Sequence, residues 1–146
     1  MIDIGTPARK AFFDALKGQV MVEDIEIPIV DEKLDDRITS HDMFILIGAQ
    51  NEQDRSNKTL FVGEVDLVLT VYNRTKATAT KTKIEAIASQ ILTIVFPTRT
   101  TYGVFVSDPY HLTSVRSTDK DYAFEKADQG FEIAKRMTFR MRITQS

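Results

Sequence analysis

The stretch FEIAKRMTFRMRITQS, residues 131–146, indicates most about the architecture of this chain. Successive side chains of a β-strand point to opposite faces, and from Phe131 to Ile143 every second position is apolar apart from Lys135. The apolar positions are Phe131, Ile133, Met137, Phe139, Met141 and Ile143. The positions between them include Arg136, Arg140 and Arg142. The stretch therefore predicts a long strand with one apolar face and one face rich in arginine.

The same alternation occurs in residues 63–72, GEVDLVLTVY, and predicts a second long strand. One face carries Val65, Leu67, Leu69 and Val71. The other face carries Glu64, Asp66, Val68, Thr70 and Tyr72. If this strand pairs with the C-terminal one, acidic and basic side chains meet across the ladder.

Shorter strands are predicted by apolar runs over residues 25–29, 43–48, 102–108 and 110–117. Pro28 places the first of them at a sheet edge, because proline has no N–H to donate to a ladder. The continuous apolar run at 43–48 is typical of a strand covered on both faces. Two polar segments, residues 50–58 and 118–130, are predicted to be loops.

Two helices are predicted, the first over TPARKAFFDALKG, residues 6–18. Thr6 is expected to cap it, with Pro7 at the first helical position and Gly18 ending it in a left-handed conformation. Its apolar stripe is Ala8, Phe12, Ala15 and Leu16, and the side chains expected away from it are Arg9, Lys10, Asp14 and Lys17.

The second helix precedes Pro97, which stops it. Its apolar stripe is Ile84, Ile87, Ala88, Ile91, Leu92 and Val95. The order helix, strands, helix, strands predicts a single α+β domain over residues 1–146. We expect a mostly antiparallel β-sheet with two α-helices packed on one face, and short connections that favour hairpins over parallel crossovers.

The composition is that of an ordinary soluble protein, with 146 residues, 42% hydrophobic and 27% charged, and a net charge of −2. The chain has no cysteine, which excludes disulfides, thiolate zinc sites and a thiol nucleophile. No apolar run approaches the roughly 18 residues that a membrane helix needs. The N-terminus lacks a secretory pattern. We therefore expect a protein that is made in a cytoplasm and does not bind a membrane.

The sequence predicts no catalytic, cofactor-binding or metal site. It lacks the G-x-S-x-G, G-x-G-x-x-G and P-loop patterns. His41 lies between Ser40 and Asp42, but neighbours on a strand point to opposite faces. His111 with Asp108 is a weak metal-ligand pair. The alternative is a small α+β enzyme or ligand-binding domain with a pocket between helix and sheet.

Charge is distributed unevenly along the chain. Residues 20–36 carry seven acidic side chains against Lys33, a net charge of −6, whereas residues 131–146 carry a net charge of +3. One interpretation is internal pairing, with Glu64 and Asp66 beside Arg136 and Arg140 across the ladder. The other is external, with an acidic patch on one copy against a basic patch on the next. Specific DNA binding is disfavoured, because Phe131 and Phe139 lie on the face opposite the arginines and cannot stack on bases there.

The order and character of the segments resemble a known family. An acidic strand with an internal proline (IEIPIVDEKLDD, 25–36) precedes MFILIGAQNEQDRSNK (43–58) and EVDLVLTVYNRT (64–75). An amphipathic helix (TKIEAIASQILTIV, 82–95) and a closing strand (RMTFRMRI, 136–143) follow. This layout is similar to that of the tail-terminator and tail-completion proteins of tailed bacteriophages, small α+β proteins that form rings at the head–tail junction.

The resemblance implies a virion structural protein without catalytic residues or cofactors, made in the cytoplasm of a host bacterium. It implies a homo-oligomeric ring, of six copies, that contacts tail tube and neck (connector) proteins while DNA passes nearby without specific binding. The candidate interface residues are Glu64, Asp66, Tyr122, Phe124, Arg136, Arg140 and Arg142. Tyr122 and Phe124 either anchor a partner from a protruding loop or fold back over the end of the sheet.

Overall fold

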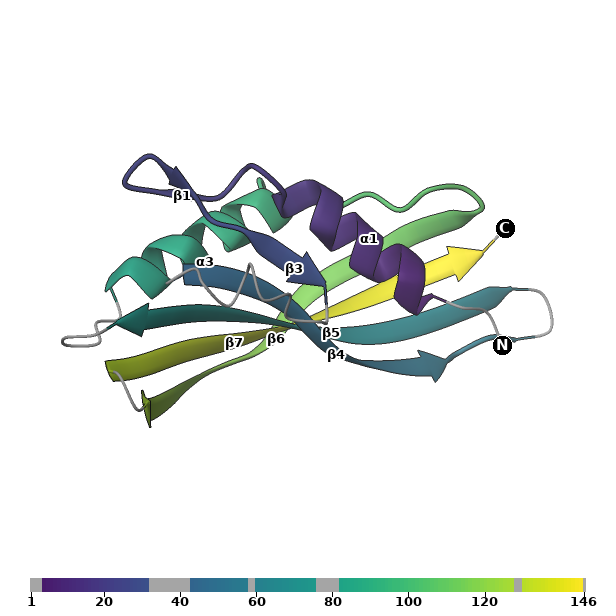
Figure 1. Cartoon of the computed structure of the whole chain (residues 1–146). Coiled ribbons are helices and arrows are strands. Elements are labelled where there is room, and N and C mark those ends of the chain that lie inside the picture. The colour runs from purple at the N-terminus through teal and green to yellow at the C-terminus, as the bar shows by residue number, and fades with distance from the viewer. Residues whose placement is uncertain (1–3, 32–42, 58–59, 76–81, 128–129, 146) are drawn as a thin grey trace.

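Two helices lie on one face of a twisted five-stranded sheet, and a small hairpin lies beside them (Figure 1). The structure is a computed structural model that describes residues 4–31, 43–57, 60–75, 82–127 and 130–145. The elements in chain order are α1 (Gly5–Leu16), β1 (Met21–Val22), β2 (Ile25–Glu26), β3 (Ile29–Asp31), β4 (Met43–Asp54), β5 (Phe61–Thr75), α3 (Thr82–Val95), β6 (Tyr110–Ala127) and β7 (Gly130–Gln145).

The sheet has the strand order β3-β4-β5-β7-β6, and every neighbouring pair except β3–β4 is antiparallel. The predicted α+β class is therefore confirmed. The expectation of hairpins alone is wrong at β3–β4, which is a parallel pair. A parallel pair needs a connection long enough to return the chain. Here residues 32–42, which lie outside the described residues, separate the two strands.

Both edges of the sheet have features that interrupt a regular ladder. The edge position predicted from Pro28 is confirmed, because β3 is an outermost strand of only 3 residues directly after it. The opposite edge is β6, which has 18 residues. Its register against β7 shifts between Leu112 and Ser114 and again between Ser117 and Asp119.

Strands are longer than the sequence patterns predicted. The predicted loop at 50–58 is wrong in part because β4 continues to Asp54, and the loop at 118–130 is wrong because β6 continues to Ala127. The end of β6 extends beyond the helices of the described chain (Figure 1), so its residues do not need an apolar face. At the end of β4 the polar residues Gln50 and Glu52 instead bond to Arg9 and Gly5 of α1. The predicted strand at 102–108 is wrong. There the Gly103 N–H bonds the Val95 carbonyl at the end of α3 instead of joining a ladder.

The core lies between the helices and the sheet face formed by alternate residues of β5 and β7. Val65 faces Met141, Leu67 faces Phe139, and Leu69 faces Met137 in the antiparallel register. All six of these side chains are buried, as the period-2 pattern predicted. The predicted stripe of α3 is confirmed as well: Ile84, Ile87, Ala88, Ile91 and Val95 are buried, and Leu92 is partly buried.

The apolar run of β4 is covered on both faces, as expected. Ile45 and Ile47 are buried in the core under the helices. Phe44 points to the other face and is also buried, with its ring stacked on Tyr72 at 4.8 Å between centroids. This stacking explains why the run at 43–48 does not alternate.

The C-terminal end of α1 agrees with the prediction, and its N-terminal end does not. Gly18 has φ +75, so the predicted left-handed stop is confirmed. The predicted cap at Thr6 is wrong, because the helix begins at Gly5 with Ile4 at the cap position and no side-chain cap bond. Instead the Gly5 N–H donates to Glu52 Oε1 at 2.8 Å, so a side chain of β4 satisfies a free donor of the first turn.

Arg9 is buried, although the helix pattern placed it away from the apolar stripe. Its guanidinium donates to the carbonyl oxygens of Ile47 at 2.7 Å and Gly48 at 2.6 Å, and to Gln50 Oε1 at 3.1 Å. The register of β4 against β5 shifts between Ile47 and Gln50, which frees these carbonyls from the ladder. Arg9 therefore binds α1 to the irregular point of β4.

The sheet extends well beyond its helices. α3 has 14 residues and a length of about 21 Å, whereas β7 has 16 residues and a length of about 54 Å. The β4–β5 hairpin projects at one end and the β6–β7 hairpin at the other (Figure 1). At the first end Leu60 and Phe61 are 43% and 55% exposed. The β4–β5 end thus presents exposed apolar side chains that are available for contacts with other proteins.

Candidate assembly surface

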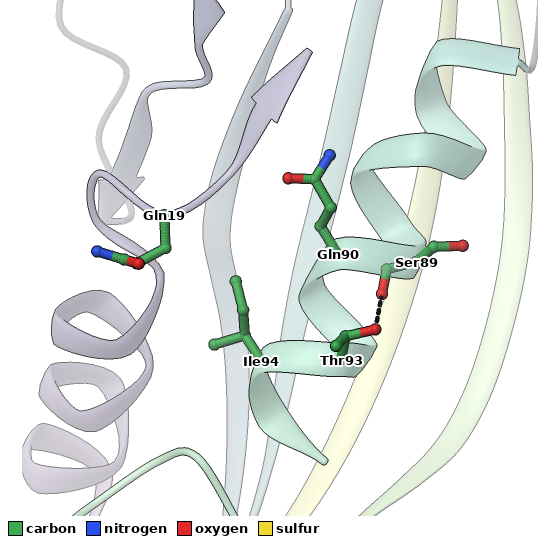
Figure 2. A pocket seen from close by; sticks show the side chains of 5 residues that line it. All are labelled: Gln19, Ser89, Gln90, Thr93 and Ile94. Atoms are coloured by element: carbon green, nitrogen blue, oxygen red, sulfur yellow. Dashed lines mark hydrogen bonds between the residues drawn. The ribbon is translucent and has the colours of Figure 1, made fainter. Parts of the chain in front are cut away.

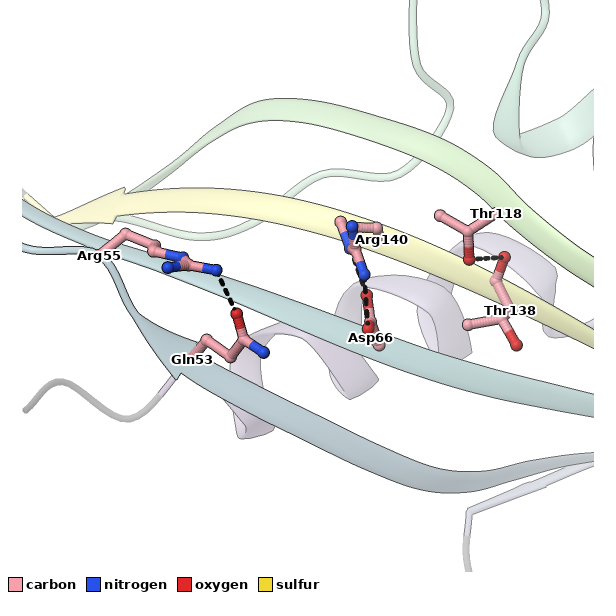
Figure 3. A network of polar contacts seen from close by, with 6 residues as sticks. All are labelled: Gln53, Arg55, Asp66, Thr118, Thr138 and Arg140. Carbon is pink, nitrogen blue, oxygen red and sulfur yellow. Dashed lines mark hydrogen bonds and ion pairs between the residues drawn. The ribbon is translucent and has the colours of Figure 1, made fainter.

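The face of the sheet that points away from α1 and α3 is covered by no helix of the described chain. We call it the open face, and Figure 3 shows part of it with α1 behind the sheet. Its charged side chains alternate with the buried core residues of the same strands. Among the side chains that the structure describes, they include Glu64 and Asp66 of β5, Arg136, Arg140 and Arg142 of β7, and Arg116 and Asp121 of β6.

Asp66 and Arg140 form a two-point ion pair across β5 and β7. They are direct partners in the register, with Arg140 Nε 2.7 Å from Asp66 Oδ1 and Nη2 3.0 Å from Oδ2 (Figure 3). The hydrogen bonds donated to Asp66, and then the charge of its carboxylate, raise the pKa of Arg140 above its ordinary value. Arg140 is therefore fixed and charged at any physiological pH.

Arg136 pairs with a residue that the sequence did not indicate. Opposite it on β5 lies Thr70, not Glu64 or Asp66, so the suggested pairing of Arg136 with those two acids is wrong. Arg136 Nη2 instead lies 2.7 Å from Asp121 Oδ2 on β6, with both side chains about half exposed. The prediction missed this partner because Asp121 belongs to a segment that was predicted to be a loop.

Two arginines of the open face remain without a partner among the described residues. Arg142 lies opposite Glu64 in the register but forms no ion pair with it. Arg116 lies opposite Arg140, whose charge is already paired with Asp66. Internal pairing therefore accounts for Arg136 and Arg140 but not for Arg116 and Arg142, both of which are exposed.

Tyr122 and Phe124 lie on β6 and not in a protruding loop. Tyr122 faces Lys135 in the register, and Phe124 faces Ile133. The Nζ of Lys135 lies 5.1 Å from the centroid of the Tyr122 ring and 2.8 Å from Glu85 Oε1. Tyr122 thus folds over the sheet, although it remains 36% exposed.

Lys135 itself is a residue whose role sequence reasoning missed. Its side chain is 9% exposed and joins β7 to Glu85, which lies in the first turn of α3. A carboxylate is favoured at that end of a helix, where the backbone N–H groups are unpaired. The available signal was the single break in an otherwise regular apolar face.

A hollow of about 240 Å³ lies between the end of α1 and α3 (Figure 2). It is lined by Gln19, Ser89, Gln90, Thr93 and Ile94, none of which ionises. The Gln90 amide accepts from the Met21 N–H at 2.9 Å and donates to its carbonyl at 2.6 Å, so it holds the β1–β2 hairpin. The lining therefore includes the hydroxyls of Ser89 and Thr93 but no ionisable side chain that could activate them.

Within the described ranges, no three His, Cys, Asp or Glu side chains converge as a metal site would require. Nor does any helix in those ranges have the length and apolarity to cross a membrane. The alternative of an enzyme with a pocket between helix and sheet thus gains no support from the residues that can be placed.

Comparison with solved structures shows a fold neighbour of this chain. A chain in the solved structure of the virion of a native gene transfer agent (GTA) particle superposes with a TM-score of 0.75, covering 99% of each chain. The two chains share one fold. Their sequences are 12% identical, which is a likeness of fold alone. No protein-family model and no curated protein sequence matches the chain.

The Asp66–Arg140 pair gives a first prediction. We expect Asp66→Asn to lower the free energy of unfolding by about 1 kcal/mol, because it removes the charge from a partly buried two-point pair across two strands. Arg142→Gln should change it by less than about 0.5 kcal/mol, because Arg142 has no ion-pair partner among the described residues. Urea denaturation of both variants measures the difference. Equal stabilities of Asp66→Asn and the wild type would mean that the pair contributes nothing.

Proposed function

We propose that this chain is a structural protein of a phage-like virion that forms or joins a ring at the head–tail junction, as a tail terminator or neck component. The observation that carries the proposal is the fold likeness to a virion chain over 99% of both chains. A fold can serve several functions, so the argument also needs surfaces suited to assembly.

The exposed parts of the sheet supply such surfaces. The open face combines fixed ion pairs with two unpaired arginines, and charged surfaces of this kind orient partners and exclude wrong ones. The two projecting hairpins lie at opposite ends of the sheet (Figure 1). A subunit of this shape can contact a neighbour through its face, the tail tube at one end and the neck at the other.

In this function the protein acts by assembly and not by turnover. Each contact between copies is weak, but closure into a ring makes the contacts cooperative, because every copy is held by two neighbours. The binding of a closed ring to the end of a tail tube would stop its growth. DNA would pass through the assembly without specific recognition.

The mass of the purified protein in solution tests the proposal. The chain has a mass of 16.6 kDa, so six copies would reach about 100 kDa. We expect light scattering and negative-stain images to show rings at high protein concentration, or a monomer that forms rings when tail tubes are added. A species that stays monomeric or dimeric at all concentrations and does not bind tail tubes would contradict the proposal.

A further inference from the structure

The β1–β2 hairpin is an acidic projection on the helix side of the sheet (Figure 1). Its two-residue turn consists of Glu23 and Asp24, and Glu26 follows on β2. All three carboxylates are exposed. Two apolar side chains beside them are exposed as well, Met21 at 45% and Ile25 at 59%.

The charges of this hairpin are almost uncompensated. Glu23 lies 3.8 Å from the Nζ of Lys83, at the limit of an ion pair, and both side chains are exposed. In the part of the chain that the structure describes, Asp24 and Glu26 have no ion-pair partner. The hairpin therefore presents two free carboxylates next to apolar surface.

The open face presents the complementary charges. Arg116 and Arg142 lie diagonally across β6 and β7, since Arg142 faces Ser114 and Arg116 faces Arg140. Diagonal neighbours on a sheet are roughly 7–8 Å apart, close enough to contact one small acidic hairpin together. No covering element of the described chain competes for these two guanidinium groups.

We propose that the β1–β2 hairpin of one copy docks on the open face of the next, with Asp24 and Glu26 against Arg116 and Arg142. The inference rests on the proposed ring and names its contact. Within one molecule the hairpin and the open face lie on opposite sides of the sheet (Figure 1). Such a contact joins different surfaces of two copies head to tail, and contacts of this kind build a ring when the rotation between copies closes.

A second copy fits this face better than a nucleic acid does. Acidic side chains lie among the arginines of the open face, namely Glu64, Asp66 and Asp121, and they would repel phosphates. Of the two described aromatic rings on this face, Phe44 is buried and Tyr72 is partly buried and stacked on it, so neither ring is fully exposed to stack on a base. The chain as a whole has a net charge of −2.

A pair of charge reversals tests the contact. The face variant carries Arg116→Glu and Arg142→Glu, and the hairpin variant carries Asp24→Lys and Glu26→Lys. Each variant alone places like charges at the contact, so we expect about a 100-fold loss of self-affinity. An equimolar mixture restores opposite charges at every contact of an alternating ring. We therefore expect the mixture to assemble at the concentrations of the wild type, as measured by light scattering.

Arg99→Glu is the matched control, because Arg99 is exposed and belongs to neither surface. It should leave self-association within about twofold of the wild type. If the wild type assembles and both double variants assemble equally well, this contact is wrong, although the proposed ring is not. Variants that fail alone and also fail when mixed would overturn it too. If the wild type binds a short DNA duplex and only the face variant loses that binding, with self-association unchanged, the face is a nucleic-acid surface instead.

Crosslinking covers the case in which the wild type associates too weakly for a mass measurement. The chain contains no cysteine, so Asp24→Cys combined with Arg116→Cys introduces the only two thiols. Their positions on opposite sides of the sheet exclude a disulfide within one copy. Under oxidation at high protein concentration we expect disulfide-linked multimers. A product that remains monomeric there, together with monomeric wild type, would refute the docking contact.

Discussion

Replacing Ile87 by Asp is expected to unfold the protein. Ile87 is fully buried on α3 in the core between helix and sheet. A carboxylate at this position would lose its hydration without gaining a partner, at a cost of several kcal/mol. That cost is comparable with the roughly 5–15 kcal/mol that stabilises a typical fold. Far-UV and near-UV circular dichroism should show the loss of both secondary and tertiary structure.

Ala86→Asp is the control for this prediction, because it places the same carboxylate one position away on the exposed side of α3. We expect it to lower stability by no more than about 1 kcal/mol. If Ile87→Asp keeps the near-UV spectrum of the wild type, the assigned inner face of α3 is wrong.

Replacing Arg9 by Met is expected to lower the free energy of unfolding by about 3 kcal/mol. The methionine keeps much of the apolar length but removes the donors to the Ile47 and Gly48 carbonyls and to Gln50 Oε1. These acceptors lie at or beside the register shift of β4, and the methionine has no donor with which to replace the lost bonds. Chemical denaturation of the purified variant measures the change.

Lys10→Met provides the comparison, since Lys10 is the next residue of α1, with a side chain that is 68% exposed. Its pair with Asp14 at 2.7 Å should contribute less than about 0.5 kcal/mol. Equal losses for the two variants would mean that the buried guanidinium is not the main link between α1 and β4.

The parts of the fold that the sequence predicted are those where one covered face imposes a strict period. β5 and β7 pack against helices along their middle, so their apolar residues recur at every second position. The pairing of the two strands then has to place both apolar faces on the same side of the sheet. The second half of β6 lies beyond the helices of the described chain, and its polar sequence resembles that of a loop. Arg9 was misplaced for a related reason, because helical periodicity cannot foresee a register shift in a strand far along the chain.

The candidate surface was predictable to the same degree. The pairing of Asp66 with Arg140 follows from two strands whose pattern was clear. The pairing of Arg136 with Asp121 depends on a strand that the sequence hid. Arg116 and Arg142 could not be singled out by counting charges. Only the strand register shows which of the arginines already have acidic partners.

The two edges of the sheet have a consequence for how this protein behaves when it is abundant. A strand of 3 residues beside a proline, and a long strand with two register shifts, are poor templates for the backbone of another chain. Fibrous stacking through main-chain hydrogen bonds is thereby discouraged. Association then depends on contacts between side chains, which are more specific than backbone hydrogen bonds. Copies at high concentration can therefore associate in one orientation instead of precipitating.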